Sequence, residues 1–217
     1  KKISKIFGHE DNVSSISVSP HGKYFITSSA DKTIRLWNAE TGLEFSDPSG
    51  RHKEIMYAFD LSENGEILAT GGPDSTLSIW NAQTGELIIN YPAMDAILNA
   101  AALSPDNKYV AVCNWGKDIN VFNTQTGTLY RKLVGMKNGS GKLAYSNNGK
   151  FIAAISSTKE LFIWNAESGD IMAQRQLETR PFALNFSNDS KLVATGEANG
   201  KIILWITETF SKVKEIE

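Results

Sequence analysis

An aromatic residue recurs through this chain at a nearly fixed interval, and that interval restricts the fold more than any other feature. Five similar segments, TIRLWN, TLSIWN, DINVFN, ELFIWN and KIILWI, carry the aromatic residues Trp37, Trp80, Phe122, Trp164 and Trp205. The spacings between these residues are 43, 42, 42 and 41 positions. Repeats of this length indicate a series of identical supersecondary units, each too small to bury its apolar face alone.

Each repeat contains the same order of short strands and tight turns. A short apolar strand such as VSSISVS leads into a turn rich in Ser, Asn, Asp, Pro and Gly, and a β-prone strand such as YFITSS follows. The aromatic-ended strand comes third, and a more polar fourth strand closes the repeat. No segment has a long apolar period of about 3.6 residues. The sequence therefore predicts an all-β chain of four-stranded antiparallel units with few helices.

Four-stranded units of this length resemble the blades of the WD-repeat family of β-propellers, which are about 40–45 residues long. In that family a His, a Ser or Thr, an Asp and the Trp form a buried hydrogen-bonded set. The matching residues are His9, Thr27, Asp31 and Trp37 in the first repeat and His52, Thr70, Asp74 and Trp80 in the second. The His-to-Trp spacing is 28 residues in both repeats, and the Asp-to-Trp spacing is six. The resemblance implies a β-propeller whose first two blades carry this network.

The later repeats depart from the family pattern. Asn follows the aromatic residue in four repeats and Ile206 follows it in the last, so the Trp-Asp dipeptide is absent. The His position of repeats three to five is occupied by Met94, Met136 and Leu177. The turn Asp is replaced by Gly116, Thr158 and Asn199. We therefore expect polar networks to hold the first two blades, and apolar packing to hold the other three.

The predicted blades span residues 8–47, 51–91, 93–134, 135–177 and 178–217, and residues 1–7 are predicted to be the outer strand of a preceding blade. Propellers protect their strand edges by closing a ring. Rings of the resembled family usually have seven blades, and sometimes six or eight. We therefore expect this segment to be part of a larger ring, with the missing blades before Lys1, after Glu217 or in another chain.

Charge and cysteine content narrow the cellular context. The formal net charge is −2, which gives no overall attraction to nucleic acid or anionic membrane. Cys113 is the single cysteine and lies in the apolar stretch VAVCN, so we expect a small buried residue and a reducing compartment. No stretch reads as a signal peptide or approaches the roughly 18 apolar residues of a membrane span. An intracellular protein of the cytoplasm or nucleus, without membrane contact, is predicted.

The chain contains one combination of residues that resembles a catalytic set. Thr27, His9 and Asp31 could serve as nucleophile, base and orienting group. The same residue types recur at the same offsets in the second repeat, which favours a buried structural network. His21, in the turn SPHGK, is expected to be exposed, and no His, Cys or carboxylate cluster has metal-ligand spacing. We predict no enzyme activity, no cofactor, no metal ion and no small-molecule substrate.

A partner surface is predicted where each repeat enters its first strand and where its second strand turns into its third. Aligned repeats place large or polar residues there, namely Tyr57, Asn99, Trp115, Arg180 and Phe182. Aromatic residues and Arg are the types most enriched at binding hot spots, so this set is a hypothetical site for proteins or peptides. Arg180 would suit a carboxylate or phosphorylated group. The alternative is that some of these residues fill cavities left by the missing histidines, as Trp115 would if it packed on Met94.

These patterns favour a protein-interaction scaffold or adaptor subunit of a larger intracellular complex. An RNA-associated propeller of ribosome assembly or translation remains the alternative. Its nearest basic and aromatic segments are Tyr130-Arg131-Lys132 and Lys23-Tyr24, which a solvated strand face also explains.

Overall fold

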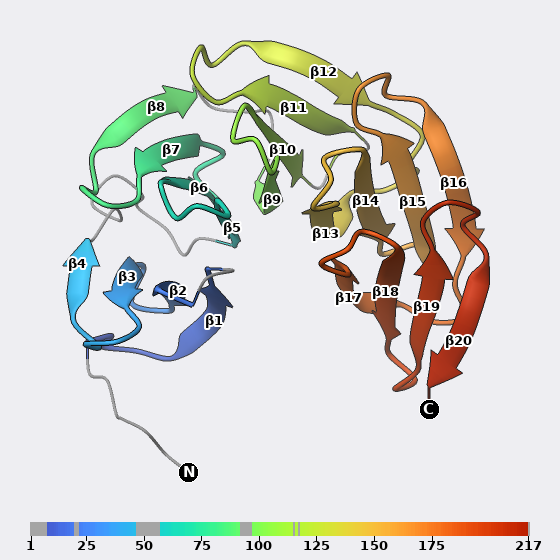
Figure 1. The fold of residues 1–217 in the computed structure, drawn as a ribbon, viewed down its shortest axis with the longest axis horizontal. Helices are drawn as coiled ribbons and strands as arrows, with labels where there is room; N and C mark the ends of the chain where they lie inside the picture. The colour runs from blue at the N-terminus through green and yellow to red at the C-terminus, as the bar shows by residue number, and fades with distance from the viewer. Residues whose placement is uncertain are drawn as a thin grey trace. The chain divides into compact units, whose positions relative to one another are not determined.

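A computed structural model describes residues 8–19, 22–46, 57–91, 97–114, 116 and 118–216, without the side chains of residues 14, 15, 45 and 46. Within these ranges all regular structure is β-strand, in five four-stranded sheets (Figure 1). Strands adjacent in the chain are hydrogen-bonded neighbours in each sheet. The predicted all-β fold of four-stranded antiparallel propeller blades is confirmed. The predicted outer strand 1–7 lies outside the described residues.

The chain divides into two compact units, residues 1–98 and 99–217. The first unit holds two sheets. Sheet 1 consists of β1 Val13–Val18, β2 Tyr24–Ser29, β3 Ile34–Asn38 and β4 Glu44–Ser46. Sheet 2 consists of β5 Ala58–Leu61, β6 Ile67–Gly71, β7 Leu77–Asn81 and β8 Leu87–Tyr91. A core that includes Ile26, Leu36, Leu68 and Trp80 joins these two sheets.

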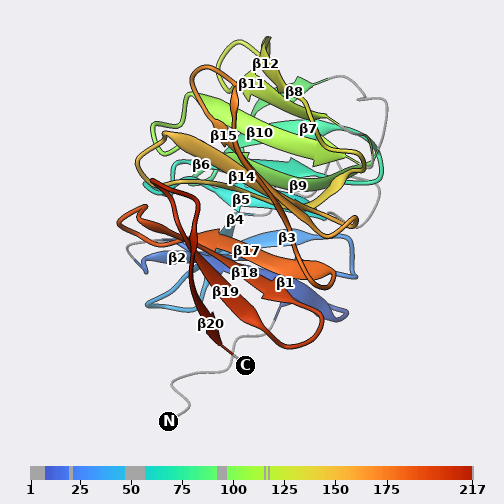
Figure 2. The same cartoon turned by 90° about the vertical axis from the view of Figure 1, so that its right-hand side faces the viewer.

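The second unit holds the other three sheets. Its first strand, β9, begins at Leu98, the last residue of the first unit. Sheet 3 consists of β9 Leu98–Leu103, β10 Tyr109–Asn114, β11 Ile119–Asn123 and β12 Leu129–Leu133. Sheet 4 consists of β13 Ser140–Tyr145, β14 Phe151–Ser156, β15 Glu160–Asn165 and β16 Ile171–Gln176. Sheet 5 consists of β17 Pro181–Phe186, β18 Leu192–Glu197, β19 Ile202–Ile206 and β20 Lys212–Ile216, which lie side by side in Figure 2.

The two middle strands of sheet 4 are apolar because both of their faces pack against other residues. In sheet 4, Ile152, Ala153 and Ala154 are all fully buried, although successive side chains of a strand point to opposite faces. The outer strand β16 contrasts with them, since Ile171 and Met172 are 47% and 45% exposed. One core joins sheets 3 and 4 and a second joins sheets 4 and 5.

A register irregularity accompanies the aromatic residue of every sheet. It falls between the third and fourth strands, immediately before Trp37, Trp80, Phe122, Trp164 and Trp205. A second irregularity affects the start of the first strand in sheets 1, 4 and 5. Bulges of this kind bend a strand and redirect a side chain, and the second one shapes the candidate site below.

The third turn of sheet 5 departs from its siblings. Gly42, Gly85, Gly127 and Gly169 adopt φ values between 69° and 81° at this turn, whereas sheet 5 has Phe210 at φ 54°. Positive φ is unfavourable for a bulky residue. The Phe210 side chain is 6% exposed and meets Phe151 edge-on at a ring separation of 5.7 Å. Core packing therefore compensates for the strained turn.

Candidate interaction surface and its supporting networks

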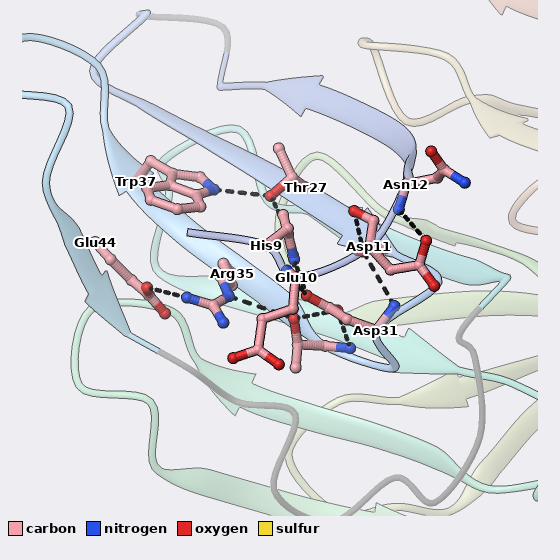
Figure 3. A network of polar contacts seen from close by, with 11 residues as sticks. His9, Glu10, Asp11, Asn12, Thr27, Asp31, Arg35, Trp37 and Glu44 are labelled. Atoms are coloured by element: carbon pink, nitrogen blue, oxygen red, sulfur yellow. Dashed lines mark hydrogen bonds and ion pairs between the residues drawn. The ribbon is translucent and has the colours of Figure 1, made fainter. Parts of the chain in front are cut away.

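A chain of buried polar contacts in sheet 1 joins the third strand to the loop that precedes β1 (Figure 3). The indole Nε1–H of Trp37 donates to Thr27 Oγ1 over 2.8 Å, and Thr27 Oγ1 lies 2.6 Å from His9 Nε2. His9 Nδ1 lies 2.8 Å from Asp31 Oδ2. In the tautomer that carries its proton on Nδ1, His9 donates to the Asp31 carboxylate, and its Nε2 accepts from the threonine hydroxyl. The predicted set His9, Thr27, Asp31 and Trp37 is therefore brought together.

Asp31 also fixes the turn that follows β2. Its carboxylate accepts hydrogen bonds from the backbone N–H of Glu10 at 2.9 Å and from the hydroxyl of Thr33 at 2.6 Å. Burial acts to raise the pKa of Asp31, but the hydrogen bonds from Thr33, Glu10 and His9 outweigh it and hold the pKa well below its ordinary value. The negative charge of Asp31 is therefore part of the folded structure.

Thr27 has the environment of a structural residue. Its side chain is 6% exposed, and its oxygen is already shared between Trp37 and His9. A nucleophile needs an oxygen that a substrate can approach. The geometry therefore supports the structural interpretation of Thr27, His9 and Asp31.

The same indole contact recurs in sheets 2 and 5. Trp80 donates to Thr70 at 2.8 Å, and Trp205 donates to Thr195 at 3.1 Å. The turn residue Asp74 accepts from the backbone N–H of Thr76, as Asp31 does from Thr33. His52 lies outside the described residues. Thr195 was not among the residues predicted from the sequence, although its ten-residue spacing to Trp205 is the one that sheets 1 and 2 share.

Sheets 3 and 4 do not use a threonine as the acceptor for the aromatic residue of the third strand. Phe122 has no indole N–H, and Trp164 donates to the backbone carbonyl of Val134 at 3.0 Å. The residues that replace the His, Met136 and Leu177, are 5% and 4% exposed within the two cores of the second unit. Apolar packing thus replaces the His network in sheets 4 and 5, as the sequence predicted, while sheet 5 retains the Thr–Trp contact.

The best-defined part of the predicted partner surface is a pair of residues at the start of β17. Pro181 pairs with Glu197 and Ala183 pairs with Gly196, so Phe182 is the extra residue of a bulge. The bulge leaves its side chain 58% exposed. The guanidinium carbon of Arg180 lies 5.3 Å from the centre of the Phe182 ring. Stacking on an aromatic ring orients the guanidinium and is favourable by about 0.5–1 kcal/mol at an exposed site.

Glu197, at the end of β18, holds the loop that carries this pair. Its Oε2 accepts from the backbone N–H and from the hydroxyl of Thr179, at 2.6 and 3.1 Å. The carbonyl of Arg180 accepts from the N–H of Ala198 at 2.9 Å. Glu197 is 6% exposed, so its carboxylate is a buried anchor that sequence patterns did not indicate. Glu160 has a comparable role in sheet 4, where it accepts from Thr158 and Gln174.

Arg180 differs from the other described arginines in its partners. Arg35 pairs with Glu44 at 2.9 Å, Arg131 donates to the carbonyl of Ser168, and Arg175 donates to the carbonyl of Phe210 at 3.0 Å. Among the described residues, no carboxylate or carbonyl accepts from the Arg180 guanidinium within hydrogen-bond distance.

The remaining members of the predicted surface belong to other sheets or lie outside the described residues. Tyr57 precedes β5 in the first unit and is 56% exposed. Asn99 is half-buried in β9 of the second unit. Trp115 lies outside the described residues, as does His21. The structure therefore brings together Arg180 and Phe182, and the five-residue patch as a whole remains a prediction.

The described residues were also searched for a reactive thiol, a metal site and a membrane-spanning helix. Cys113 is 2% exposed, and burial raises its thiol pKa to about 12, which keeps it protonated. The described residues contain no group of three or more His, Cys, Asp or Glu positioned to hold a metal ion. They also contain no helix long and apolar enough to cross a membrane.

Comparison with known proteins shows the family of these repeats. The family model "WD domain, G-beta repeat" matches residues 1–38, 49–81 and 178–205. Those segments include the three Thr–Trp contacts of sheets 1, 2 and 5. The chain carries WD repeats. Each matched WD segment thus holds a threonine that accepts from its tryptophan, and the unmatched sheets 3 and 4 lack this threonine.

Several curated proteins are similar to this WD-repeat chain over a short segment. The "Ribosome biogenesis protein BOP1 homolog" of Drosophila melanogaster, of Drosophila willistoni and of Drosophila grimshawi is 49% identical over 35 residues. That segment is 16% of this chain and only 4% of each relative's own length. The matched length is shorter than one repeat of this chain, so the likeness does not extend to the relatives as whole proteins.

Proposed function

We propose that this WD-repeat chain is an interaction scaffold or adaptor subunit of an intracellular complex, in the cytoplasm or nucleus, and that Arg180 and Phe182 contact a protein or peptide partner. The observation that carries the proposal is the Arg180 guanidinium, stacked on an exposed Phe182 and without an acceptor among the described residues. Arg and aromatic residues are enriched at hot spots, and a rigid aromatic costs little entropy when a partner covers it. WD repeats are typical of proteins that bind other proteins.

The chemistry of the pair favours a partner with a carboxylate or phosphate. A guanidinium presents parallel N–H groups that match two oxygens of such a group. The aromatic ring limits the orientations of the guanidinium before binding, which reduces the entropy lost on complex formation. Glu197 and Thr179 hold the loop on which both side chains stand, so the pair is fixed to the sheet.

An RNA-associated propeller of ribosome assembly or translation is the alternative, and the similarity to ribosome biogenesis proteins of Drosophila favours ribosome assembly. Its candidate surface is the segment Tyr130 to Lys132 on the outer strand β12. Arg131 stacks on Tyr130 at 5.2 Å, but it also donates to the carbonyl of Ser168. Lys132 pairs with Asp118 at 2.7 Å. These cations already have partners, so the segment offers less to a phosphate backbone than its sequence implied.

The two Arg–aromatic pairs provide a matched experiment. Arg180→Ala with Phe182→Ala removes the first pair, and Tyr130→Ala with Arg131→Ala removes an equivalent pair from an outer strand. Each tagged protein is captured from a lysate of its source cells, with and without ribonuclease, after circular dichroism and thermal unfolding confirm that both variants remain folded. Bound proteins are then compared by quantitative mass spectrometry.

The outcomes separate the two functions. Scaffolding through the proposed pair predicts that specific partners fall at least about tenfold with the first variant only, whether or not ribonuclease is present. Loss of the same partners from both variants, or from the β12 variant alone, contradicts the role of Arg180 and Phe182. Partners that disappear with ribonuclease and return at low salt indicate binding through RNA.

A further inference from the structure

The chain contains four Asn-Gly pairs, the combination in which an asparagine most readily loses its side-chain amide. The backbone nitrogen of the glycine can approach the asparagine side chain easily, because glycine has no Cβ and its backbone is little restricted. The pairs begin at Asn64, Asn138, Asn148 and Asn199, and all four asparagines are exposed. Sequence and exposure therefore do not distinguish the four pairs, but their hydrogen bonds do.

Three of the pairs lie in tight turns that hold both reacting groups. The side-chain oxygens of Asn64, Asn148 and Asn199 accept from the backbone N–H two residues later, over 3.1, 3.0 and 3.2 Å. The glycine N–H of each pair donates to a backbone carbonyl of the same turn, over 2.9, 2.8 and 3.1 Å. These glycines have φ values between 70° and 87°. Such a turn has to open before the glycine nitrogen can lose its proton and approach the side chain.

The fourth pair, Asn138 and Gly139, lies in the loop between β12 and β13 (Figure 1). Among the described residues, none is hydrogen-bonded to the side chain of Asn138 or to the N–H of Gly139. The first anchor of the chain after this pair is Ser140, whose hydroxyl donates to the carbonyl of Ile155 at 3.1 Å. Neither of the hydrogen bonds that hold the three turns therefore has to break here.

We propose that Asn138 is a site of spontaneous deamidation, which the fold selects from the four Asn-Gly pairs. The backbone nitrogen of Gly139 loses its proton to base and forms a bond to Cγ of Asn138. The bond from Cγ to Nδ2 breaks, and the side-chain nitrogen takes up a proton and leaves as ammonia. Water then opens the resulting succinimide ring at either carbonyl, which gives aspartate or isoaspartate at position 138. Both products carry one negative charge more than asparagine at neutral pH.

The isoaspartate product changes the backbone immediately before β13, because it inserts one side-chain carbon into the main chain. The next residue, Ser140, pairs with Ser156, and its carbonyl accepts from the Cys113 thiol at 3.3 Å. Deamidation therefore gives the loop between sheets 3 and 4 an added negative charge and, in the isoaspartate form, a longer main chain next to an ordered strand.

Incubation of the whole chain tests the proposal, with the other three pairs as internal controls. Folded chain and chain unfolded in guanidinium chloride are kept in mildly alkaline buffer at physiological temperature, and peptide mapping by mass spectrometry follows each pair separately. In the folded chain, Asn138 is expected to react at least about tenfold faster than Asn64, Asn148 and Asn199, because no hydrogen bond has to break first. In guanidinium chloride the four rates should become comparable.

Two substitutions provide a matched pair of variants, each checked for folding by circular dichroism. Asn138→Gln keeps the amide but requires a larger ring, so it should abolish the first acidic species that isoelectric focusing detects. Asn64→Gln should leave that species unchanged. Equal rates at the four pairs of the folded chain overturn the proposal, and would mean that the burial of Gly139 keeps base from its N–H. A preference for Asn138 that persists in guanidinium chloride overturns it as well, because the cause would then be the local sequence.

Discussion

Sheets 1 and 4 bury a tryptophan at the same position of the repeat by different means. Trp37 donates to a threonine that continues through His9 to the charged Asp31, whereas Trp164 donates directly to the carbonyl of Val134. Both indoles are almost fully buried, at 3% and 0% exposure. A buried N–H requires an acceptor, but the acceptor need not be a side chain. The WD signature is therefore one of at least two solutions that this chain uses for the same requirement.

The difference also changes what surrounds each tryptophan. Sheet 1 uses three polar side chains, those of Thr27, His9 and Asp31, and its Trp37 stacks on Phe25 at 5.9 Å. Sheet 4 stacks Trp164 on Phe162 at 5.3 Å and fills the His position with Met136. A network that includes an ionised group depends on pH and on each of its members. An apolar cluster depends mainly on the volume that it fills.

The largest expected effect is the removal of the sheet 4 tryptophan. Trp164→Ala leaves a cavity in the core shared with sheet 3, and we expect it to lower the free energy of unfolding by about 3–5 kcal/mol. Hydrogen exchange followed by mass spectrometry locates the loss, which is expected in residues 140–176. Met172→Ala is the control in the same sheet, because Met172 is 45% exposed and its loss should change stability by less than about 0.5 kcal/mol. A cost below that of the control would mean that apolar packing does not hold sheet 4.

Removal of the threonine acceptor tests the polar half of the comparison. Thr27→Val keeps the shape of the side chain but leaves the indole of Trp37 and the ring of His9 without their shared partner. We expect it to lower the free energy of unfolding by about 1–3 kcal/mol, measured in urea. Thr195→Val in sheet 5 removes a single donor–acceptor contact, so a smaller loss of about 1 kcal/mol is expected. Equal losses in the two variants would show that His9 and Asp31 add nothing to the contact.

Acid titration tests the contribution of the ionised Asp31 to the stability of sheet 1. The pKa of Asp31 is lowered in the folded chain, so folding favours the ionised form. The stabilisation is complete above the ordinary value of 3.8 and declines as the pH falls below it towards the folded pKa, because the unfolded chain takes up the proton first. Urea midpoints for the unmodified chain and for Asp31→Asn should therefore converge in acid. Parallel pH profiles for the two proteins would exclude Asp31 as a source of stability.

The sequence predicted those parts of the molecule that depend on periodicity. The repeat of the aromatic residue and the order of strands and turns within each repeat predicted the four-stranded units. The resemblance to the WD-repeat family implied the contacts of His9 with Thr27 and Asp31. The contact of Thr195 with Trp205 could also have been predicted, because the spacing of these two residues equals that of Thr27 and Trp37. The hydrogen bond from Trp164 to the carbonyl of Val134 could not be predicted, because every residue has a backbone carbonyl and no residue type marks this acceptor. Glu197 was missed because a carboxylate in a strand reads as exposed until the structure shows the N–H and hydroxyl of Thr179 beside it.

The site was less predictable than the fold, for a physical reason. Exposure at the start of a first strand depends on the bulge, and a bulge moves one residue out of the pairing register without a fixed sequence motif. Alignment of the repeats placed Phe182 at this position, but only the register of β17 with β18 shows that its ring is turned to solvent. The stacking of Arg180 on that ring follows from the same local geometry.

The smallest expected effect concerns the ion pair at the edge of the sheet 1 network. Arg35 pairs with Glu44 at 2.9 Å, and both side chains retain contact with solvent. Glu44→Gln should therefore lower the free energy of unfolding by less than about 1 kcal/mol, and added salt should reduce the difference from the unmodified chain. The Lys132–Asp118 pair of sheet 3 is the control, with Asp118→Asn expected to behave in the same way. A loss from Glu44→Gln that is larger and independent of salt would mean that Arg35 is coupled to Thr33, 3.4 Å from its Nε, and that the polar network extends to the outer strand.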